Sequence, residues 1–299
     1  MPSTPPPTPT PKPLQPLRGV RILSLALNVP GPMALLRLRA MGARCTKVEP
    51  PAGDPMQHYN PKAYAEIHQG VKVMQLDLRT EAAQKALDRQ LARTDVLLTS
   101  FRPSGLAKLG LGWKALHKRH PALSQVAIVG AHGARAEEPG HDLTYMAEND
   151  LVSGLDLPPT LYADMGGSLM ASEAVLQAVL QWQRSGKGAY LEVALASASA
   201  YLGLPRQWGM TLPTGAVGGA HAGYRIYPCK DGRVAVAALE PHFAAALCEV
   251  AGVEGGRRAD MFATATHAAV ARCFASRSCA ELDALGQARD IPIHSLKDR

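Results

Sequence analysis

The run Val20-Arg21-Ile22-Leu23-Ser24-Leu25-Ala26-Leu27 decides the fold, together with the segment that follows it. The run is short, β-rich and mostly apolar, and it predicts a buried strand. Asn28-Val29-Pro30-Gly31-Pro32 interrupts it, apolar residues then recur at helical spacing over 33–41, and Cys45-Thr46-Lys47-Val48-Glu49 predicts a second strand. Strand, helix and strand in this order predict a βαβ unit with parallel pairing and a right-handed crossover.

The same alternation continues downstream. We expect strands at 73–78, 96–100, 125–130 and 190–195, with helices at 80–92, 106–120, 143–149 and 165–184. This pattern is typical of the α/β class and predicts a doubly wound, Rossmann-like parallel sheet. The large domain is expected to span 18–202, behind a disordered, proline-rich arm at 1–17.

Composition changes after Leu202, where prolines and glycines predict a linker or mobile loop. We expect 203–299 to contain this linker and a smaller α+β domain. Its strands would form a hairpin at 224–237 with a turn at Asp231-Gly232, and helical stretches would run from there to the end of the chain.

Composition excludes several classes of protein. The 299 residues are 46% hydrophobic and 19% charged, and we find neither a membrane-spanning apolar run nor a signal-like start, so we expect a cytoplasmic protein without a membrane partner. The net charge is +7, but the basic residues are dispersed and aromatics make up only 5%, which argues against nucleic acid and fits a small polyanion. Five cysteines without Cys-x-x-Cys spacing favour reduced thiols.

The first βαβ unit suggests a dinucleotide-binding fold, with Glu49 as the acid that would bind the ribose. The turn after the first strand does not follow the G-x-G-x-x-G pattern, and its two prolines remove N–H groups that would hold a pyrophosphate. A nicotinamide enzyme is therefore disfavoured.

Three motifs carry candidate catalytic groups: Gly140-His141-Asp142, Ala163-Asp164-Met165-Gly166-Gly167 and Leu239-Glu240-Pro241. An imidazole and a carboxylate that converge on one carbon can remove a proton from one face and return it to the other. Each group also has a purely structural interpretation. Asp142 and Asp164 precede helical stretches, where Asp is a favoured N-cap, and Glu240 before Pro241 could simply open a helix.

The order of several motifs resembles the class III CoA-transferase family. The resemblance rests on Gly19-Val20-Arg21-Ile22-Leu23, Pro30-Gly31-Pro32, Gly42-Ala43-x-x-x-Lys47-Val48-Glu49-Pro50 and Phe101-Arg102-Pro103-x-Gly105. Within that family, the motifs around His141, Asp164 and Glu240 resemble the α-methylacyl-CoA racemase branch. The resemblance implies an acyl-CoA substrate and an interlocked homodimer, whose site lies where one subunit's large domain meets the other's small domain. No metal or redox cofactor is implied.

The resemblance also implies roles for single residues. His141 matches the histidine base, Asp164 the opposing acid, and Glu240 an acid that supports the histidine. Asp142 matches the aspartate expected to be the nucleophile in the transferase branch, and Arg102 matches an arginine that contacts CoA.

The sequence departs from the family pattern at positions expected to bind phosphate. Pro50 stands where an arginine is common, Gly70-Val71-Lys72 replaces Gly-Lys-Arg, and the chain ends at Arg299 where family members usually continue. We therefore expect Arg102, Lys47 and Lys72 to contact CoA. Backbone N–H groups near Gly166 would bind the thioester oxygen.

Three functions follow from this reading. The first is an acyl-CoA racemase that moves a proton at the α-carbon of a 2-methylacyl-CoA. The alternative is a CoA-transferase that forms an aspartyl intermediate at Asp142. The third is a CoA-binding protein without catalytic activity.

Overall fold

The computed structural model describes residues 14–297, which divide into two compact units, one ending at Gly203 and one beginning at Leu204. The larger unit is built on a six-stranded parallel sheet with the order β3-β2-β1-β4-β5-β6. Its strands are β1 (Arg21–Ser24), β2 (Arg44–Glu49), β3 (Lys72–Gln75), β4 (Val96–Thr99), β5 (Ser124–Val129) and β6 (Tyr190–Ala194). This order is that of a doubly wound sheet, which confirms the predicted fold class. Successive strands are added toward one edge from β1 to β3 and toward the other edge from β4 to β6, so the order reverses between β1 and β4.

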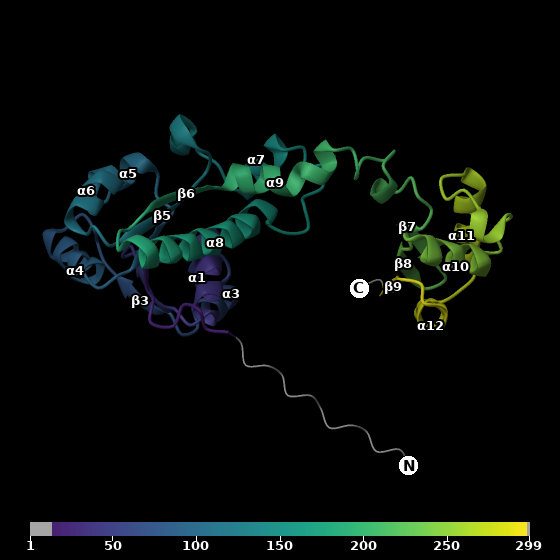
Figure 1. Cartoon of the computed structure of the whole chain (residues 1–299), viewed down its shortest axis with the longest axis horizontal. Helices are drawn as coiled ribbons and strands as arrows, with labels where there is room; N and C mark the ends of the chain where they lie inside the picture. The colour runs from purple at the N-terminus through teal and green to yellow at the C-terminus, as the bar shows by residue number, and fades with distance from the viewer. Residues whose placement is uncertain (1–13, 298–299) are drawn as a thin grey trace, which may run out of the picture. The chain divides into compact units, whose positions relative to one another are not determined.

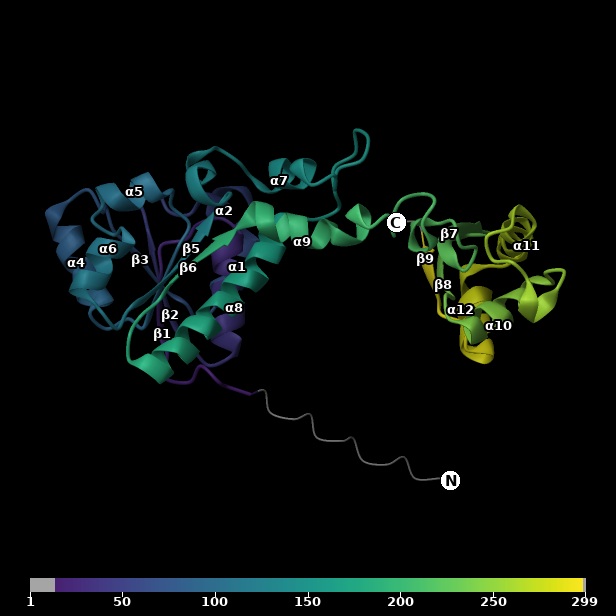
Figure 2. The ribbon, with the colours of Figure 1, turned by 45° about the horizontal axis from the view of Figure 1, so that its top comes forward.

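Helices cover both faces of this sheet (Figures 1 and 2). One face carries α1 (Pro30–Ala40) and α8 (Tyr162–Ser185), which share a hydrophobic cluster with the strands. The other carries α4 (Glu81–Leu91), α5 (Pro103–Lys108) and α6 (Trp113–Arg119), which pack into a second cluster. Because both faces are covered, the central strands β4 and β5 are buried along their whole length, whereas the edge strand β3 is largely exposed.

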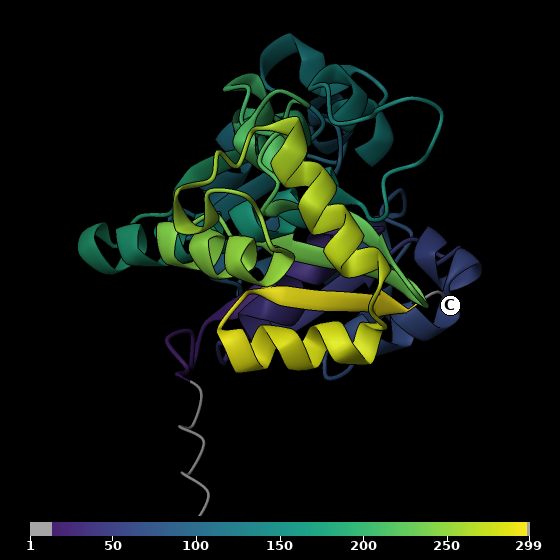
Figure 3. The same ribbon diagram turned by 90° about the vertical axis from the view of Figure 1, so that its right-hand side faces the viewer.

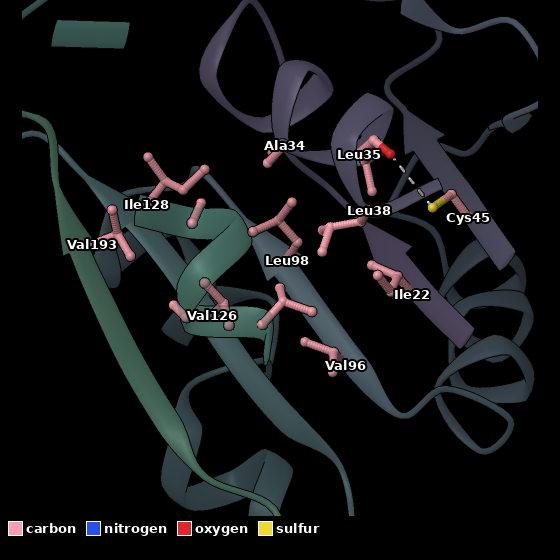
Figure 4. Packing of buried hydrophobic residues seen from close by; sticks show 14 of the residues in the cluster. Ile22, Ala34, Leu35, Leu38, Cys45, Val96, Leu98, Val126, Ile128 and Val193 are labelled. Atoms are coloured by element: carbon pink, nitrogen blue, oxygen red, sulfur yellow. Dashed lines mark hydrogen bonds between the residues drawn. The ribbon is translucent and has the colours of Figure 1, made fainter. Parts of the chain in front are cut away.

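The core beneath α1 shows how successive residues of a strand serve opposite faces. Ile22 and Leu98 belong to the cluster with α1 and α8, whereas Leu23 belongs to the cluster with α4 to α6. Figure 4 shows Leu38 of α1 among the side chains of β1, β4 and β5 in the first cluster. The Cys45 thiol of β2 reaches the backbone carbonyl of Leu35 at 3.9 Å.

The prolines after β1 begin a helix instead of delaying it. We expected the helix to start at residue 33, but α1 begins at Pro30. Proline is tolerated in a first turn because the N–H that it lacks would have no helical partner there. Asn28, just before this turn, has a φ of 62°.

Two further segments differ from the sequence prediction. The helix expected at 106–120 is split into α5 and α6, and Gly110 has a φ of 68° between them. Between β2 and β3 lie two helices that were not predicted, α2 (Pro55–Tyr59) and α3 (Pro61–Ile67). Their N-cap residues are Asp54 and Asn60, whose side chains accept hydrogen bonds from the N–H groups of Met56 and Ala63.

The second unit is an α+β domain. The predicted hairpin forms as β7 (Tyr224–Cys229) and β8 (Gly232–Ala237), but helices do not run to the end: β9 (Ile293–Lys297) pairs antiparallel with β8. Its helices are α10 (Pro241–Ala251), α11 (Thr264–Ala275) and α12 (Cys279–Arg289), with short 3-10 turns at Ala216–Gly218 and Gly256–Arg258. Figure 3 shows α12 in yellow beside β9.

Two further helices and one turn complete the described residues. The larger unit contains α7 (Asp142–Glu148) and a 3-10 turn at Gly133–Glu137, and α9 (Leu195–Gln207) runs across the boundary between the two units.

The arm predicted at 1–17 lies mostly outside the described residues. Leu17, its last residue, is 1% exposed and donates its N–H to the Met41 carbonyl at 3.0 Å. None of the helices within 14–297 has the length and apolar character needed to cross a membrane.

Candidate active site

A cavity of about 160 Å³ opens at the carboxyl ends of β1 and β4. Asn28 lines it from the segment after β1, and Phe101 and Arg102 line it from the segment after β4. This is the point at which the strand order reverses, and open α/β sheets bind their ligands there. The sheet topology therefore places the candidate site before any side chain is considered.

His141 and Asp164 line the same cavity. His141 is exposed and stands at the N-cap of α7, where its N–H donates to the Thr144 hydroxyl at 3.1 Å and its carbonyl accepts from that hydroxyl at 2.7 Å. Asp164 lies in the first turn of α8. The structure thus brings together the imidazole and the carboxylate that the sequence singled out.

Asp142 has a different position from the one expected of a nucleophile. Its side chain is only 6% exposed, it is not among the residues that line the cavity, and its Oδ1 accepts a hydrogen bond from the Asp164 N–H at 3.0 Å. Asp142 therefore caps a helix, as one interpretation of the sequence allowed, but the helix is α8 and not its own. Asp164 caps nothing, since the N-cap of α8 is Leu161.

The environment of Asp164 changes its acidity. Burial, together with the smaller effect of the nearby Asp142 charge, raises the pKa of Asp164 to about 7. Both effects disfavour a second negative charge in a poorly solvated place. At neutral pH this carboxyl is therefore close to half protonated, which suits a group that must both give and take a proton.

Tyr145 forms one wall of the cavity. A Cβ added at Gly130 would lie 2.3 Å from the Tyr145 hydroxyl oxygen, and one at Gly140 would lie 2.5 Å from it, so both glycines are needed for this packing. Burial raises the pKa of Tyr145, and the charge of Asp164 adds to this, whereas Arg102 opposes it. The hydroxyl thus stays protonated near a carboxyl and a guanidinium.

A second pocket, of about 470 Å³, lies at the carboxyl ends of β1, β2 and β3. Its walls are mostly apolar, with Glu49, Asp77 and Arg79 as charged members, and Arg79 donates to the Asp77 carboxylate at 2.8 Å and 2.9 Å. Phe101 lines both this pocket and the cavity with His141. The two hollows are therefore neighbours along one edge of the sheet.

Only one of the three basic residues expected to contact CoA lines either hollow, and that residue is Arg102. The Lys47 side chain has no exposure and is enclosed by acids, so it does not reach a phosphate in this structure. Lys72 is exposed but begins β3 at Lys72–Gln75, and the pockets lie at the other end of the strands.

Gly166 does not offer the N–H that was expected of it. It is buried in α8 against α9, where an added Cβ would lie 3.1 Å from Leu202. Nearer the start of the helix, the Asp164 N–H is bound by Asp142 and the Met165 N–H donates to the Leu161 carbonyl at 3.0 Å.

Glu240 belongs to the second unit. It is the exposed N-cap residue of α10, without a hydrogen bond from its side chain to that helix. Its proposed support of His141 stays a prediction.

Sequence reasoning did not single out Arg79, Asn28 or Tyr145. Asn28 and Arg79 follow the predicted strands at 20–27 and 73–78, so position after a strand was the available signal. Tyr145 is four residues after His141, one helical turn along the same face.

Two clusters within residues 14–297 hold three potential metal-ligand atoms each: Cys229, Asp231 and Cys279, and Glu49, Asp54 and His68. In the second cluster the Lys47 ammonium lies 3.0 Å from Glu49 Oε1 and 2.9 Å from His68 Nε2, in the place that a cation would take.

Residues 17–299 match CoA-transferase family III, so this chain belongs to that family. Its relatives include acyl-CoA racemases and CoA-transferases, which supports an enzyme of one of these two types.

Three relatives show the range of functions. The chain is 33% identical over 205 residues to the probable fatty acyl-CoA transferase Rv3272 of Mycobacterium tuberculosis, covering 62% of this chain and 52% of that protein. It is 30% identical over 259 residues to the alpha-methylacyl-CoA racemase of Mus musculus, covering 80% and 65%. It is 32% identical over 201 residues to a succinyl-CoA–D-citramalate CoA-transferase of Chloroflexus aurantiacus, covering 62% and 50%. The chain thus spans between half and just under two thirds of these relatives.

The fold is shared with solved structures. The crystal structure of Rv3272 superposes with a TM-score of 0.80 at 27% identity, covering 94% of this chain and 84% of that one. A CAIB/BAIF family protein from Brucella suis, at 22% identity and a TM-score of 0.78, has the same fold.

Proposed function

We propose that the protein is an acyl-CoA racemase that moves a proton at the α-carbon of a 2-methylacyl-CoA thioester. One observation carries the proposal: His141 and Asp164 line one cavity, and the pKa of Asp164 is raised to about 7. A carboxyl whose pKa is raised toward neutral pH and an imidazole on the same cavity can exchange roles as acid and base.

The reaction needs a single proton shared by the two groups. In one direction the Asp164 carboxylate removes the α-proton, an enolate forms, and protonated His141 delivers a proton to the opposite face. In the reverse direction neutral His141 is the base and protonated Asp164 is the acid. General acid–base groups contribute about 10²–10⁴-fold to such steps.

The enolate oxygen requires hydrogen-bond donors. Because the first N–H groups of α8 are already bound, we assign this role to the Tyr145 hydroxyl and the Arg102 guanidinium, which both line the cavity. Donors fixed in a poorly solvated site contribute about 10²–10³-fold each.

The two neighbouring hollows suit the two ends of an acyl-CoA. The cavity of about 160 Å³ would hold only the reacting thioester. The apolar pocket of about 470 Å³ would take the adenine, with Arg79 near the phosphates in place of the arginine that Pro50 replaces.

An interlocked homodimer is part of the proposal, with Glu240 of each subunit supporting His141 of the other. Mixing His141→Ala protein with Glu240→Ala protein tests this. If the sites are shared, one of the two sites in a mixed dimer carries both changes and the other site carries neither. Activity should therefore return on mixing. No recovery after subunit exchange would contradict the shared site.

The decisive experiment incubates (S)-2-methylbutanoyl-CoA with the protein in D₂O. We expect deuterium at the α-carbon and loss of stereochemical purity, and both should be nearly abolished in Asp164→Asn and His141→Ala. Binding of CoA with neither exchange nor transfer would favour the non-catalytic alternative.

Transfer of CoA between carboxylic acids is the second candidate. The geometry favours Asp164 over Asp142 as its nucleophile. Asp142 is buried and bound to α8, whereas Asp164 faces the cavity, so Asp164 is the carboxylate that could attack a thioester. Attack would give an acyl–aspartyl anhydride and CoA thiolate. The thiolate would then attack the aspartyl carbonyl, break the anhydride bond and release the donor carboxylate, which leaves an aspartyl-CoA thioester.

His141→Ala separates the two functions, because a transferase does not require a base on the second face. Hydroxylamine trapping at Asp164 in a protein that transfers CoA to succinate, with no uptake of deuterium, would overturn the racemase proposal.

A further inference from the structure

The Lys47 ammonium is enclosed in a buried cluster of charged and polar groups. Its Nζ lies 3.0 Å from Glu49 Oε1, 2.9 Å from His68 Nε2, and in direct contact with Asp54 Oδ2. The side chains of Lys47, Glu49 and Asp54 are at most 1% exposed. A buried lysine that meets two carboxylates and an imidazole is a specific arrangement, because each of these groups loses its hydration.

Hydrogen bonds fix the charge state of the cluster. His68 Nδ1 lies 2.8 Å from the Tyr64 carbonyl and therefore donates to it, which leaves Nε2 to accept from Lys47. Burial lowers the pKa of His68, and the Lys47 charge lowers it further, so the imidazole is neutral. The Tyr64 hydroxyl donates to Glu49 at 2.9 Å. One positive charge thus faces two negative charges.

Asp54 connects the cluster to the candidate active site. Its carboxylate accepts from the Asn28 N–H at 3.1 Å and 3.2 Å, through its two oxygens, and from the Met56 N–H at 2.9 Å. Asn28 has a φ of 62° and lines the cavity that holds His141 and Asp164. Asn is one of the few residues other than glycine that adopt this left-handed backbone readily, and the hydrogen bonds that its N–H donates to Asp54 help to hold it there.

Glu49 connects the cluster to the second pocket, whose wall it forms together with Phe101 and Arg79. One ammonium therefore contacts both the acid that anchors the cavity and an acid that lines the neighbouring pocket. Apolar side chains of the same volume would fill this space, but they would offer no acceptor to the Asn28 N–H.

We propose that Lys47 is a positioning residue for CoA-thioester binding: it holds Asp54 and Glu49 in place, and through them the backbone at Asn28 and the wall of the second pocket. The inference rests on the proposed binding of CoA in these two hollows. It replaces the phosphate contact expected of Lys47 with an action through its neighbours.

Calorimetric titration with CoA tests the proposal on a set of matched variants. Asp54→Ala removes the acceptor for the Asn28 N–H, whereas Asp54→Asn keeps an oxygen there. We expect Asp54→Ala to bind CoA at least about tenfold more weakly, the scale of one lost hydrogen bond to a charged group, and Asp54→Asn to bind more tightly than Asp54→Ala. Lys85→Met, which breaks the exposed pair between Lys85 and Glu81, is the control and should bind like the wild type.

Lys47→Met tests the ammonium itself. It leaves two buried carboxylates without a counter-charge, so CoA binding should be weaker than in the wild type. Lys47→Met combined with Asp54→Asn removes one charge of each sign, and should bind CoA more tightly than Lys47→Met alone. If Lys47→Met alone does not fold, the double variant is used in its place to measure CoA binding without the ammonium.

The outcomes distinguish the proposed CoA binding from the positioning role of Lys47. Wild-type protein that binds no CoA overturns the proposed function and the inference with it. Wild-type protein that binds CoA, together with Asp54→Ala and Lys47→Met proteins that bind it equally well, overturns the inference alone and leaves the cluster with a role in folding only.

Discussion

The Asp142 carboxylate accepts a hydrogen bond from the backbone N–H of Asp164 at 3.0 Å. This bond joins the first residue of α7 to the first turn of α8. His141, which precedes Asp142 in the chain, and Asp164 itself both line the cavity. Asp142 thus sets the spacing of the candidate acid and base, and its charge also acts on the acidity of Asp164.

Asp142→Asn is expected to shift the pH dependence of the reaction. The substitution keeps an oxygen for the Asp164 N–H but removes the charge that helps to raise the pKa of Asp164 above its usual value. The pKa of Asp164 should therefore fall, and the acidic limb of the rate of α-proton exchange should move to lower pH. Burial, the larger cause, is unchanged, so the pKa should stay above that of an exposed aspartate. A limb that does not move would contradict the charge effect.

Asp164→Asn is expected to stabilise the fold at pH 8 while it abolishes activity. Folding raises the pKa of Asp164 to about 7, so the folded state binds the proton more tightly than the unfolded state and loses stability as pH rises from 4 to 7. A difference of one between two pKa values corresponds to about 1.4 kcal/mol. Thermal unfolding should therefore occur at a higher temperature in the variant at pH 8, with little difference at pH 4. An equal effect at both pH values would show that the charge is not responsible.

Gly140→Ala is expected to damage the site by displacing Tyr145. The new Cβ would lie 2.5 Å from the Tyr145 hydroxyl oxygen and 2.7 Å from its ring carbons, closer than atoms in proteins approach. We expect a loss of more than about tenfold in kcat, because misplaced catalytic groups lose on the order of 10²-fold. Gly105→Ala is the control, since its Cβ would meet nothing nearer than Phe101 at 3.9 Å. Wild-type kcat in Gly140→Ala would exclude this role for Tyr145.

Arg79→Ala and Lys72→Ala should differ in their effects on CoA affinity. Arg79 lines the second pocket, whereas Lys72 stands at the opposite end of β3. Only the Arg79 change should weaken CoA binding, and the loss should shrink at high salt, since salt screens an exposed contact with phosphate. Equal losses in the two variants would place the phosphates elsewhere.

The sequence predicted the large sheet well because its central strands β4 and β5 are buried on both faces. Runs such as Val96-Leu97-Leu98 are apolar throughout, and the helices between them have amphipathic spacing. Short helices were missed at Pro55–Tyr59 and Pro61–Ile67, since their few residues carry no periodic signal and their starts depend on Asp54 and Asn60. β9 was missed because its pairing with β8 joins residues distant in the sequence.

The candidate site was predicted in part. His141 and Asp164 could be named from their motifs, but the hydrogen bond from Asp164 to Asp142 depends on how two separate helices begin. Lys47 and Lys72 are basic residues on segments that flank the ligand edge of the predicted sheet, but neither charge nor position in the sequence tells a buried ammonium from an exposed one. Only the folded chain shows that the first lies within a cluster of acids and the second lies at the far end of its strand.

The first turn of α1 has a wider consequence. Pro30 and Pro32 occupy the position at which dinucleotide enzymes of the same strand order hold a pyrophosphate on free N–H groups. Gly31 lies so close to the segment after β1 that an added Cβ would be 2.1 Å from Ala26. The helix is packed tightly against that segment but offers no N–H at two of its first three positions. This sheet therefore lacks the backbone N–H groups that usually bind an anion at the start of the first helix. An anionic ligand must be held by side chains farther out along the edge.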